Sequence, residues 1–276
     1  MDGIVLTQQQ KEQYEENGYL ILSKFLNGEE VRLLYGIATE DKIMRSNAMD
    51  FNDQSNKSTK LTLWFTPGED VYSLLIRSQS IVDAVQTLLG DGEVCHFHSK
   101  LMQKEPKVGG AWEWHQDYGY WYKNGFLYPE AMISVMLALT EANLQNGCLQ
   151  VLKGSHKMGR LEHSFAGEQQ GADMNFVEQA LTRLEKVEVV LNSGDLLFFH
   201  SNLLHMSEAN LSDKARWSLI SAYNLSYNIP FREKNTSCIT PVNVVADDAF
   251  LTSGVRGLSQ DSDFLKKENE ITLKEN

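Results

Sequence analysis

Short apolar or alternating segments follow one another from Glu93 to about residue 228, separated by turns rich in Gly, Asn and Asp. Segments of this length and pattern predict β-strands, and many in succession predict an all-β sandwich or barrel. We expect strands at 93–103, 112–118, 131–139, 148–152, 186–191, 195–200 and 216–226, and one helix at 173–184. The chain is therefore predicted to be mainly β with flanking helices, in a jelly-roll arrangement.

The N-terminal residues carry helical signals instead. Thr7 with Gln10 three residues later is a candidate capping box, and Gly18 is a candidate stop. We expect helices at 7–17, 27–45 and 80–89, and a polar loop at 46–60 that could close over a bound molecule.

Together these patterns predict one domain. It would contain an N-terminal helical part (1–92), a β core (93–228) and a C-terminal extension (229–276). Length alone is compatible with one domain or two. Residues 255–276 are polar and rich in charge, so we expect a loose tail there.

Bulk properties narrow the class of partner and compartment. The net charge of −12 disfavours binding to nucleic acid or to an anionic membrane, because both need basic patches. Three widely spaced cysteines (Cys95, Cys148 and Cys238) predict no disulfide framework. The sequence lacks a signal-peptide pattern and an apolar stretch of about 20 residues. We expect a cytoplasmic protein whose partner is a small molecule.

A candidate metal site comes from His115 and Asp117. Residues two apart on a strand point to the same side, so both side chains are expected to reach one ion. A third ligand should come from residues 194–205, where His200 and His205 are both candidates. Two histidines and one carboxylate leave positions open on iron for a cosubstrate and for oxygen. Such a pair is common by chance, so His115 could instead be a core histidine and Asp117 a turn cap.

Arg216 strengthens the metal-site interpretation. It lies 11 residues after His205, at the start of an apolar strand, and its guanidinium suits the far carboxylate of a diacid. Taken alone, it could equally be a rim arginine. His96 and His98 form a second candidate metal pair, but no partner with suitable spacing follows them, and His156 is expected in a turn or at the rim.

Three signatures of other enzyme classes are absent. The sequence contains no H-E-x-x-H motif of zincin proteases, no G-x-S-x-G elbow, and no P-loop or dinucleotide fingerprint. The sequence therefore gives no support to these enzyme classes.

The motifs together resemble those of the phytanoyl-CoA dioxygenase-like family of iron(II)/2-oxoglutarate oxygenases, which includes ectoine hydroxylases and aminoalkylphosphonate hydroxylase-like relatives. The resemblance spans residues 93–228, about half of the chain, and implies a double-stranded β-helix. It is carried by Trp114–Tyr118 with Trp121, by Asn146–His156, by Gly194–Ser207, by Asn210 and by Arg216–Ser218.

The resemblance also implies roles for individual residues. His115, Asp117 and His205 would bind iron(II), with His205 favoured over His200 by its spacing from Arg216. Arg216, with Ser218, would hold the far carboxylate of 2-oxoglutarate. Two weaker candidates on the preceding strand are Lys100, for the cosubstrate, and Gln103, for the substrate.

The implied reaction consumes oxygen, converts 2-oxoglutarate to succinate and carbon dioxide, and hydroxylates an unactivated C–H bond. Halogenating relatives lack the carboxylate ligand, so the presence of Asp117 favours hydroxylation.

The substrate is expected to be small and polar or zwitterionic: an aminoalkylphosphonate, an ectoine-like compound or an amino-acid derivative. Aromatic faces suit a cationic group, and Tyr118 and Trp121 are the candidate substrate contacts. Many of the aromatic residues near the ligands could instead be packing: Trp112, Trp114, Tyr118, Tyr120, Trp121 and Tyr122. Lys153, Lys157 and Arg160 could meet an anionic group or form a solvated loop. Two alternatives stay open: an acyl-CoA hydroxylase, and a metal-free binding module on the same fold.

Overall fold

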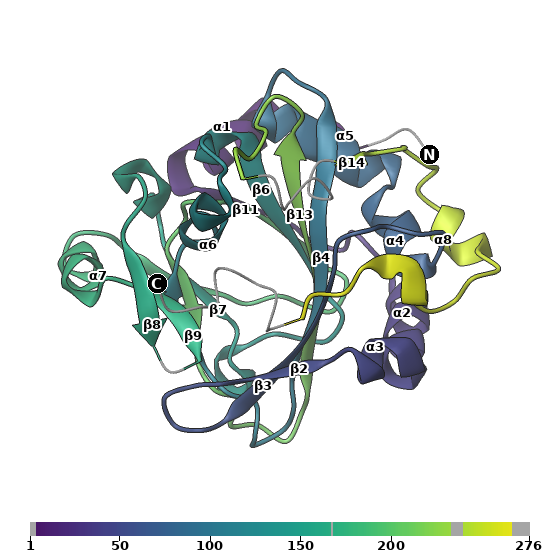
Figure 1. Ribbon diagram of the computed structural model, residues 1–276, viewed down its shortest axis with the longest axis horizontal. Coiled ribbons are helices and arrows are strands. Elements are labelled where there is room, and N and C mark those ends of the chain that lie inside the picture. Colours follow the sequence, from purple (N-terminus) through teal and green to yellow (C-terminus); the bar gives the residue numbers. More distant parts are fainter. Residues whose placement is uncertain (1–3, 167, 233–239, 267–276) are drawn as a thin grey trace.

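The computed structural model describes residues 4–166, 168–232 and 240–266 (Figure 1). The strands are β1 (Tyr19–Leu22), β2 (Met49–Asn52), β3 (Ser58–Trp64), β4 (Val94–Lys104), β5 (Trp112–His115), β6 (Met132–Ala138), β7 (Leu149–Leu152), β8 (His163–Ala166), β9 (Gln169–Ala172), β10 (Lys186–Val189), β11 (Leu196–His200), β12 (His205–Ser207), β13 (Arg216–Leu225) and β14 (Thr240–Pro241). The α-helices are α1 (Gln8–Asn17), α2 (Gly28–Glu40), α3 (Lys42–Ser46), α4 (Val71–Ile76), α5 (Gln79–Leu89), α6 (Asp117–Asn124), α7 (Met174–Leu181) and α8 (Ala249–Thr252).

Two sheets form the β core. The larger has eight strands in the order β1-β11-β6-β13-β4-β3-β2, with β14 also paired to β4. The smaller has the order β10-β7-β12-β5, and β8 pairs with β9 separately. The mainly β jelly roll with flanking helices is therefore confirmed, and every strand expected from the sequence is present, although the one expected at 112–118 ends at His115.

The two faces of the large sheet pack against different partners. Leu101 and Leu219 belong to a core cluster that includes residues of helices α2, α4 and α5, and these helices lie on one side of the sheet in Figure 1. Met102 and Ile220, the next residues along β4 and β13, belong to the cluster that reaches β7 of the smaller sheet. This alternation places the side chains of every second residue between the two sheets.

The N-terminal part contributes strands as well as helices. Helix α1 begins after Thr7, whose side chain forms the expected capping box with Gln10. The helix expected at 27–45 is interrupted, because Asp41 has an extended backbone, ends α2 and caps α3. The apolar run of β1 extends the large sheet beside β11, a strand that the helical interpretation missed.

The loop expected at 46–60 is largely a hairpin of β2 and β3. Met49 pairs with Leu61 and Asn52 pairs with Ser58, so the loop expectation was wrong for these strands. The turn is held by Asp53, which accepts hydrogen bonds from backbone N–H groups at its tip. Polar residues on the outer face hid the strand pattern, although Leu61 is buried between the sheets.

The expectation of a loose tail was wrong for residues 255–266. Leu258 is 3% exposed, and its N–H group donates a hydrogen bond to Asp41. Phe264 forms a β-bridge with Trp64, and Leu265 donates to the carbonyl oxygen of Leu63. The remainder, 267–276, lies outside the described residues.

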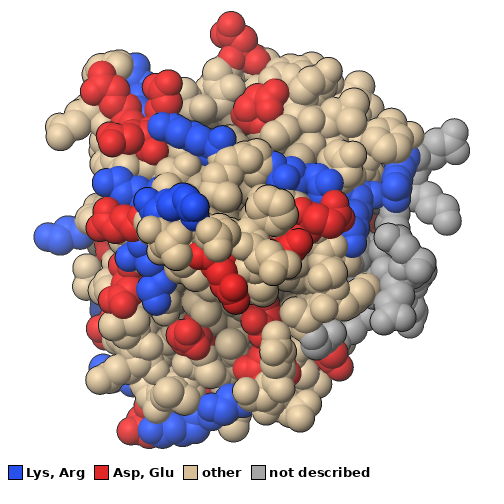
Figure 2. Space-filling model, turned by 90° about the vertical axis from the view of Figure 1, so that its left-hand side faces the viewer, with Lys and Arg blue, Asp and Glu red and all other residues tan. Residues whose placement is uncertain are grey.

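Three features expected from the bulk composition can be followed in the structure: the cysteines, the absence of a membrane span and the surface charge. Cys95 and Cys148 are buried and free, and Cys238 lies outside the described residues. Within the described ranges, none of the helices combines the length and apolarity needed to cross a bilayer. Acidic and basic side chains are interleaved over the face shown in Figure 2, so that face carries no extended patch of one sign.

The backbone conformation and the close packing at position 194, in the turn before β11, both require a glycine. Its φ is +91°, and an added Cβ would collide with the carbonyl oxygen of Leu26. Gly194→Ala should therefore lower the free energy of unfolding by about 1–3 kcal/mol, measured by chemical denaturation. Gly36→Ala is the matched control, because its Cβ would meet nothing on the exposed face of α2 and should slightly stabilise the helix. Equal effects at both positions would contradict this assignment.

Candidate active site

Three buried side chains from three elements converge between the sheets. His115 ends β5, Asp117 begins α6 and His205 begins β12, where it pairs with His115. One ligand atom of each residue lies within 4.8 Å of the others. Oδ1 of Asp117 lies 3.8 Å from Nε2 of His115 and 4.0 Å from Nε2 of His205. This arrangement could hold one metal ion.

The convergence does not arise from strand alternation. Strand β5 ends at His115, so the expected strand 112–118 is wrong in its second half, where Asp117 opens a helix. The intervening Gln116 is completely buried, and its amide donates to the carbonyl oxygens of Gly159 and Asn202. These bonds fix the turn that brings the carboxylate beside the imidazole.

Hydrogen bonds determine the tautomer of both histidines. Nδ1 of His115 donates to the carbonyl oxygen of Glu113 at 2.7 Å, and Nδ1 of His205 donates to that of Leu203 at 2.8 Å. A carbonyl oxygen can only accept, so each Nε2 keeps its lone pair and faces Asp117. Burial lowers the pKa of both imidazoles, which keeps them neutral as metal binding requires.

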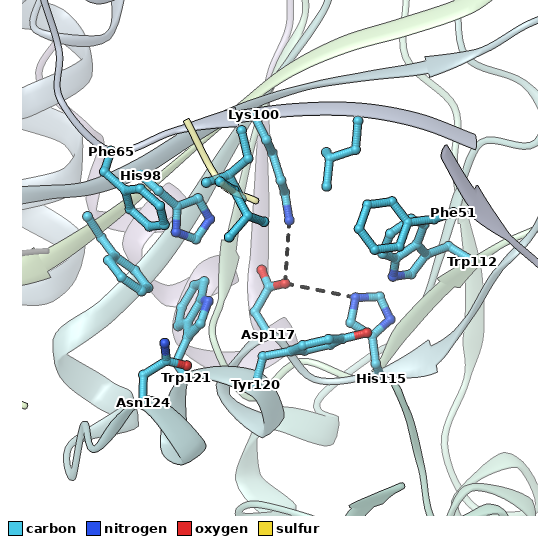
Figure 3. A pocket seen from close by; sticks show the side chains of 14 residues that line it. Phe51, Phe65, His98, Lys100, Trp112, His115, Asp117, Tyr120, Trp121 and Asn124 are labelled. Carbon is cyan, nitrogen blue, oxygen red and sulfur yellow. Dashed lines mark ion pairs between the residues drawn. The ribbon is translucent and has the colours of Figure 1, made fainter. Parts of the chain in front are cut away.

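Asp117 is held as a carboxylate. Burial raises the pKa of Asp117. Lys100, His205 and the hydroxyl of Ser134 lower it by a larger amount in total, so the net pKa lies below the ordinary value. Lys100 Nζ is 3.9 Å from Oδ1, and Ser134 Oγ donates to Oδ2 (Figure 3 shows the Lys100 contact). One oxygen thus faces the histidines while the other is anchored on β6.

Ser134→Ala should weaken iron(II) binding by about 10- to 100-fold, because a group that orients a ligand is lost. The affinity would be measured by anaerobic titration of the apoprotein. Ser201→Ala is the control, since that hydroxyl donates to the carbonyl oxygen of Pro129 and touches no ligand. Equal affinities for the two variants would refute the role given to Ser134.

A small cavity adjoins the triad. Its lining includes His115, His205 and Arg216. Nε of Arg216 and Oγ of Ser218 are buried and find no hydrogen-bond partner among the described residues. Burial lowers the pKa of Arg216 to about 10, which still leaves the guanidinium charged at neutral pH. Buried donors without partners are costly, so these groups fit an anionic cosubstrate bound beside the metal.

Lys104 supports this region and was missed in the sequence. It pairs with Arg216 in the register of β4 and β13, and its side chain is completely buried. Nζ donates to Ser207 Oγ at 2.7 Å and to the carbonyl oxygen of Glu208 at 2.6 Å. Burial and then Arg216 lower the pKa of Lys104 well below its ordinary value. The signal in the sequence was its spacing, because Lys104 is four residues from Lys100 on one strand and therefore points to the same face.

A larger cavity also borders the triad, through His115 and Asp117 (Figure 3). Its empty space, counted together with the open solvent at its mouth, is about 670 Å³. Lys100 and His115 border both cavities. The described lining residues are Phe51, Leu61, Leu63, Phe65, Phe97, His98, Lys100, Trp112, His115, Asp117, Tyr120, Trp121, Asn124 and Leu265.

The candidate substrate residues divide between the cavity and the core. Trp121 lines the larger cavity, as do Trp112 and Tyr120. Tyr118 does not line it, although it packs in the same apolar cluster as Trp121, and its hydroxyl donates to the carbonyl oxygen of Phe126. Gln103 pairs with Trp217 on β13. It is three residues from Lys100 along β4, so its side chain points to the opposite face of the sheet and lines neither cavity.

The basic residues after β7 also lie away from the cavities. Arg160 stacks on the ring of Tyr122 and pairs with Glu162. Lys153 lies 3.9 Å from a carboxylate of Glu185, and neither it nor Lys157 is among the lining residues of the two cavities. The structure therefore places none of these three side chains in the lining of a cavity beside the triad.

The remaining histidines do not join the triad. His200 contacts the ring of His156 at 5.1 Å, and His156 bonds to the carbonyl oxygen of Glu15. His96 bonds to a serine hydroxyl, whereas His98 faces the larger cavity, so the second candidate metal pair does not converge. In the part of the chain that the structure describes, the triad is the one cluster with metal-binding geometry.

Comparison with known proteins identifies the family. A family model described as phytanoyl-CoA dioxygenase (PhyH) matches residues 14–218, which is well over half of the chain. The chain belongs to the phytanoyl-CoA dioxygenase family. It is an iron- and 2-oxoglutarate-dependent dioxygenase.

Relatives within the phytanoyl-CoA dioxygenase family carry different names. A 2-aminoethylphosphonate dioxygenase from uncultured bacterium HF130_AEPn_1 is 27% identical over 235 residues, covering 79% of this chain and 81% of that protein. The L-proline trans-4-hydroxylase of Streptomyces griseoviridis is 28% identical over 178 residues, 59% of this chain and 66% of that protein. The crystal structure of EctD from S. alaskensis with bound iron superimposes with a TM-score of 0.73 at 20% identity, covering 89% of each chain.

Proposed function

We propose that this dioxygenase hydroxylates an unactivated C–H bond of a small polar or zwitterionic molecule. In this proposal His115, Asp117 and His205 bind iron(II), while Arg216 and Ser218 hold the far carboxylate of 2-oxoglutarate. The substrate binds in the larger cavity. The observation that carries the proposal is the position of the triad between two cavities, one with unpaired buried donors and the other with aromatic walls.

Each group of residues has a distinct task. The triad would hold the metal through two imidazoles and one carboxylate, a ligand set that leaves room for a cosubstrate and for oxygen. Arg216 offers a planar fork of donors that matches a carboxylate and sets the orientation of the cosubstrate. Met136 and Phe199 line this cavity and limit the access of water. Iron and 2-oxoglutarate, when bound, supply the oxidation of the C–H bond with release of succinate and carbon dioxide.

The substrate class is supported by the cavity wall and by the relatives. The larger cavity is bordered by the aromatic side chains of Trp112, Tyr120 and Trp121, whose faces suit a cationic group on a small molecule. Relatives are named for 2-aminoethylphosphonate, ectoine and L-proline, and others are named for phytanoyl-CoA. The proposed substrate is therefore an aminoalkylphosphonate, an ectoine-like compound or an amino-acid derivative.

The same observations support the proposal that the chain is one oxygenase domain. Strands β1, β2 and β3 of the N-terminal part belong to the same sheet as β4, β6, β11 and β13. Residue Leu265 of the C-terminal extension lines the larger cavity. Both ends of the described chain therefore contribute to the framework or wall of the site.

The substrate proposal is tested by succinate formation. The protein would be incubated in air with iron(II), 2-oxoglutarate and one compound at a time: 2-aminoethylphosphonate, ectoine, L-proline or phytanoyl-CoA. We expect at least one of the three small zwitterions to raise succinate formation above the level without substrate. Stimulation by phytanoyl-CoA alone would overturn the assignment.

A further inference from the structure

A β-bulge re-aims two side chains of β4 into the larger cavity. His98 pairs with Ala222 and His96 pairs with Tyr223, so two neighbouring residues of β13 face three residues of β4. Phe97 is the extra residue. Bulges of this kind change the direction of nearby side chains and are frequent beside active sites. Phe97 and His98 consequently both line the cavity, while the ring of His96 packs near Tyr223.

The imidazole of His98 is enclosed by aromatic rings and has no hydrogen-bond partner among the described residues. Its ring is 5.9 Å from Trp121, 6.3 Å from Phe65 and 4.5 Å from Phe97, each in an edge-to-face arrangement. The residue is 5% exposed, and its ring nitrogens make no hydrogen bond within the described residues. Burial and then Lys100 lower its pKa well below the ordinary value, so the ring is neutral. A buried imidazole keeps one donor and one acceptor for a ligand.

Lys100 follows two residues later on the same face of β4 and points into the same cavity (Figure 3). Among the described residues that line this cavity, Asp117 is the sole acid. Iron(II) and Arg216 together carry three positive charges, and Asp117 with the two carboxylates of 2-oxoglutarate carries three negative charges. Once the metal and cosubstrate are bound, the ammonium group of Lys100 therefore remains as an unbalanced positive charge facing the substrate.

We propose that the primary substrate is an organic acid, and that its carboxylate or similar oxyanion binds between Nζ of Lys100 and the ring of His98. The inference rests on the proposed function, because it concerns the same cavity. The rest of the molecule packs against the aromatic wall of Trp112, Tyr120 and Trp121. An ammonium group elsewhere on the substrate would meet aromatic faces instead of an acid.

The proposal is tested with matched pairs of acids and neutral derivatives. The protein with iron(II) and 2-oxoglutarate would be titrated without oxygen, and the visible band of the iron–cosubstrate complex would report binding. The probes are L-proline and L-prolinamide, 2-aminoethylphosphonate and its diethyl ester, and phenylacetate and phenylacetamide. We expect at least one acid to bind 10-fold or more tightly than its neutral partner. The absence of acid-selective binding across the panel would overturn the proposal, while the band itself would still report the proposed iron and cosubstrate sites.

Variants separate the two residues from their surroundings. Lys100→Met should weaken binding of the selected acid by about 100-fold, because the oxyanion loses its charged partner. Lys100→Arg should restore most of this loss. His98→Phe should weaken binding of the acid by about 10-fold. His98→Gln, which retains a donor, should recover part of the lost affinity. Lys60→Met, an exposed lysine of β3, is the control and should change nothing.

The same variants distinguish substrate from cosubstrate. If Lys100→Met weakens the binding of 2-oxoglutarate and leaves the affinity for the acid unchanged, Lys100 binds the cosubstrate and the inference is wrong. If His98→Phe and His98→Gln are equally damaging, the ring contributes shape alone and not a hydrogen bond.

Discussion

Replacing His205 by alanine should abolish iron(II) binding and succinate formation, whereas the same change at His200 should leave both. His205 points its free Nε2 at Asp117, and its loss removes one of three ligands. Groups that merely orient a ligand change affinity by about 10- to 100-fold, so loss of a ligand itself should cost more than about 100-fold. His200 is of similar chemistry but contacts His156 outside the site. Iron content and succinate formation would be measured on both variants.

The pair is informative because both histidines lie within six residues of each other. Circular dichroism and thermal unfolding would show that each variant is folded. Turnover that survives His205→Ala but not His200→Ala would exchange the two roles and would refute the assigned ligand set.

Arg216→Met should raise the apparent KM for 2-oxoglutarate by at least about 100-fold, because a buried carboxylate would lose its charged partner. The guanidinium has an unpaired Nε, and its nearest polar contact is the sulfur of Met136 at 3.8 Å. Arg216→Lys should recover only part of the loss, since an ammonium group cannot form the two parallel bonds of the planar fork. Initial rates at varied 2-oxoglutarate would give the constants.

The control for this series is Arg183→Ala, an arginine of the α7 end that bonds to Gln179 far from either cavity. Its KM for 2-oxoglutarate should match that of the unmodified protein. An unchanged KM in Arg216→Met would exclude this arginine from the cosubstrate site, and iron affinity should remain near normal in the same variant.

Strand periodicity predicted the parts of the fold that depend on local sequence. β4, β6 and β13 are long apolar or alternating runs, and each forms close to its expected range. The hairpin of β2 and β3 was missed, because β3 is stabilised by pairing with β4 and β2 by pairing with β3, rather than by their own composition. The segment around Leu258 was missed for the same reason, since its order comes from contacts with Asp41.

The site was predicted in its chemistry more than in its geometry. The residue types and spacing selected the three converging residues, but the argument from strand alternation misplaced Asp117, which begins a helix. Ser134 and Lys104 act from other strands, and no local motif marks them. The orientation of His98 depends on a shift in register between β4 and β13, which a single sequence does not reveal.

The most direct test of the central claim is an anaerobic titration of the apoprotein with iron(II) and then 2-oxoglutarate. We predict a weak visible charge-transfer band from the chelated complex. The band should be lost in Asp117→Ala and should require much more 2-oxoglutarate in Arg216→Met. A correctly folded protein that binds iron(II) and 2-oxoglutarate without any such band, or whose band survives in Asp117→Ala, would contradict the proposed site.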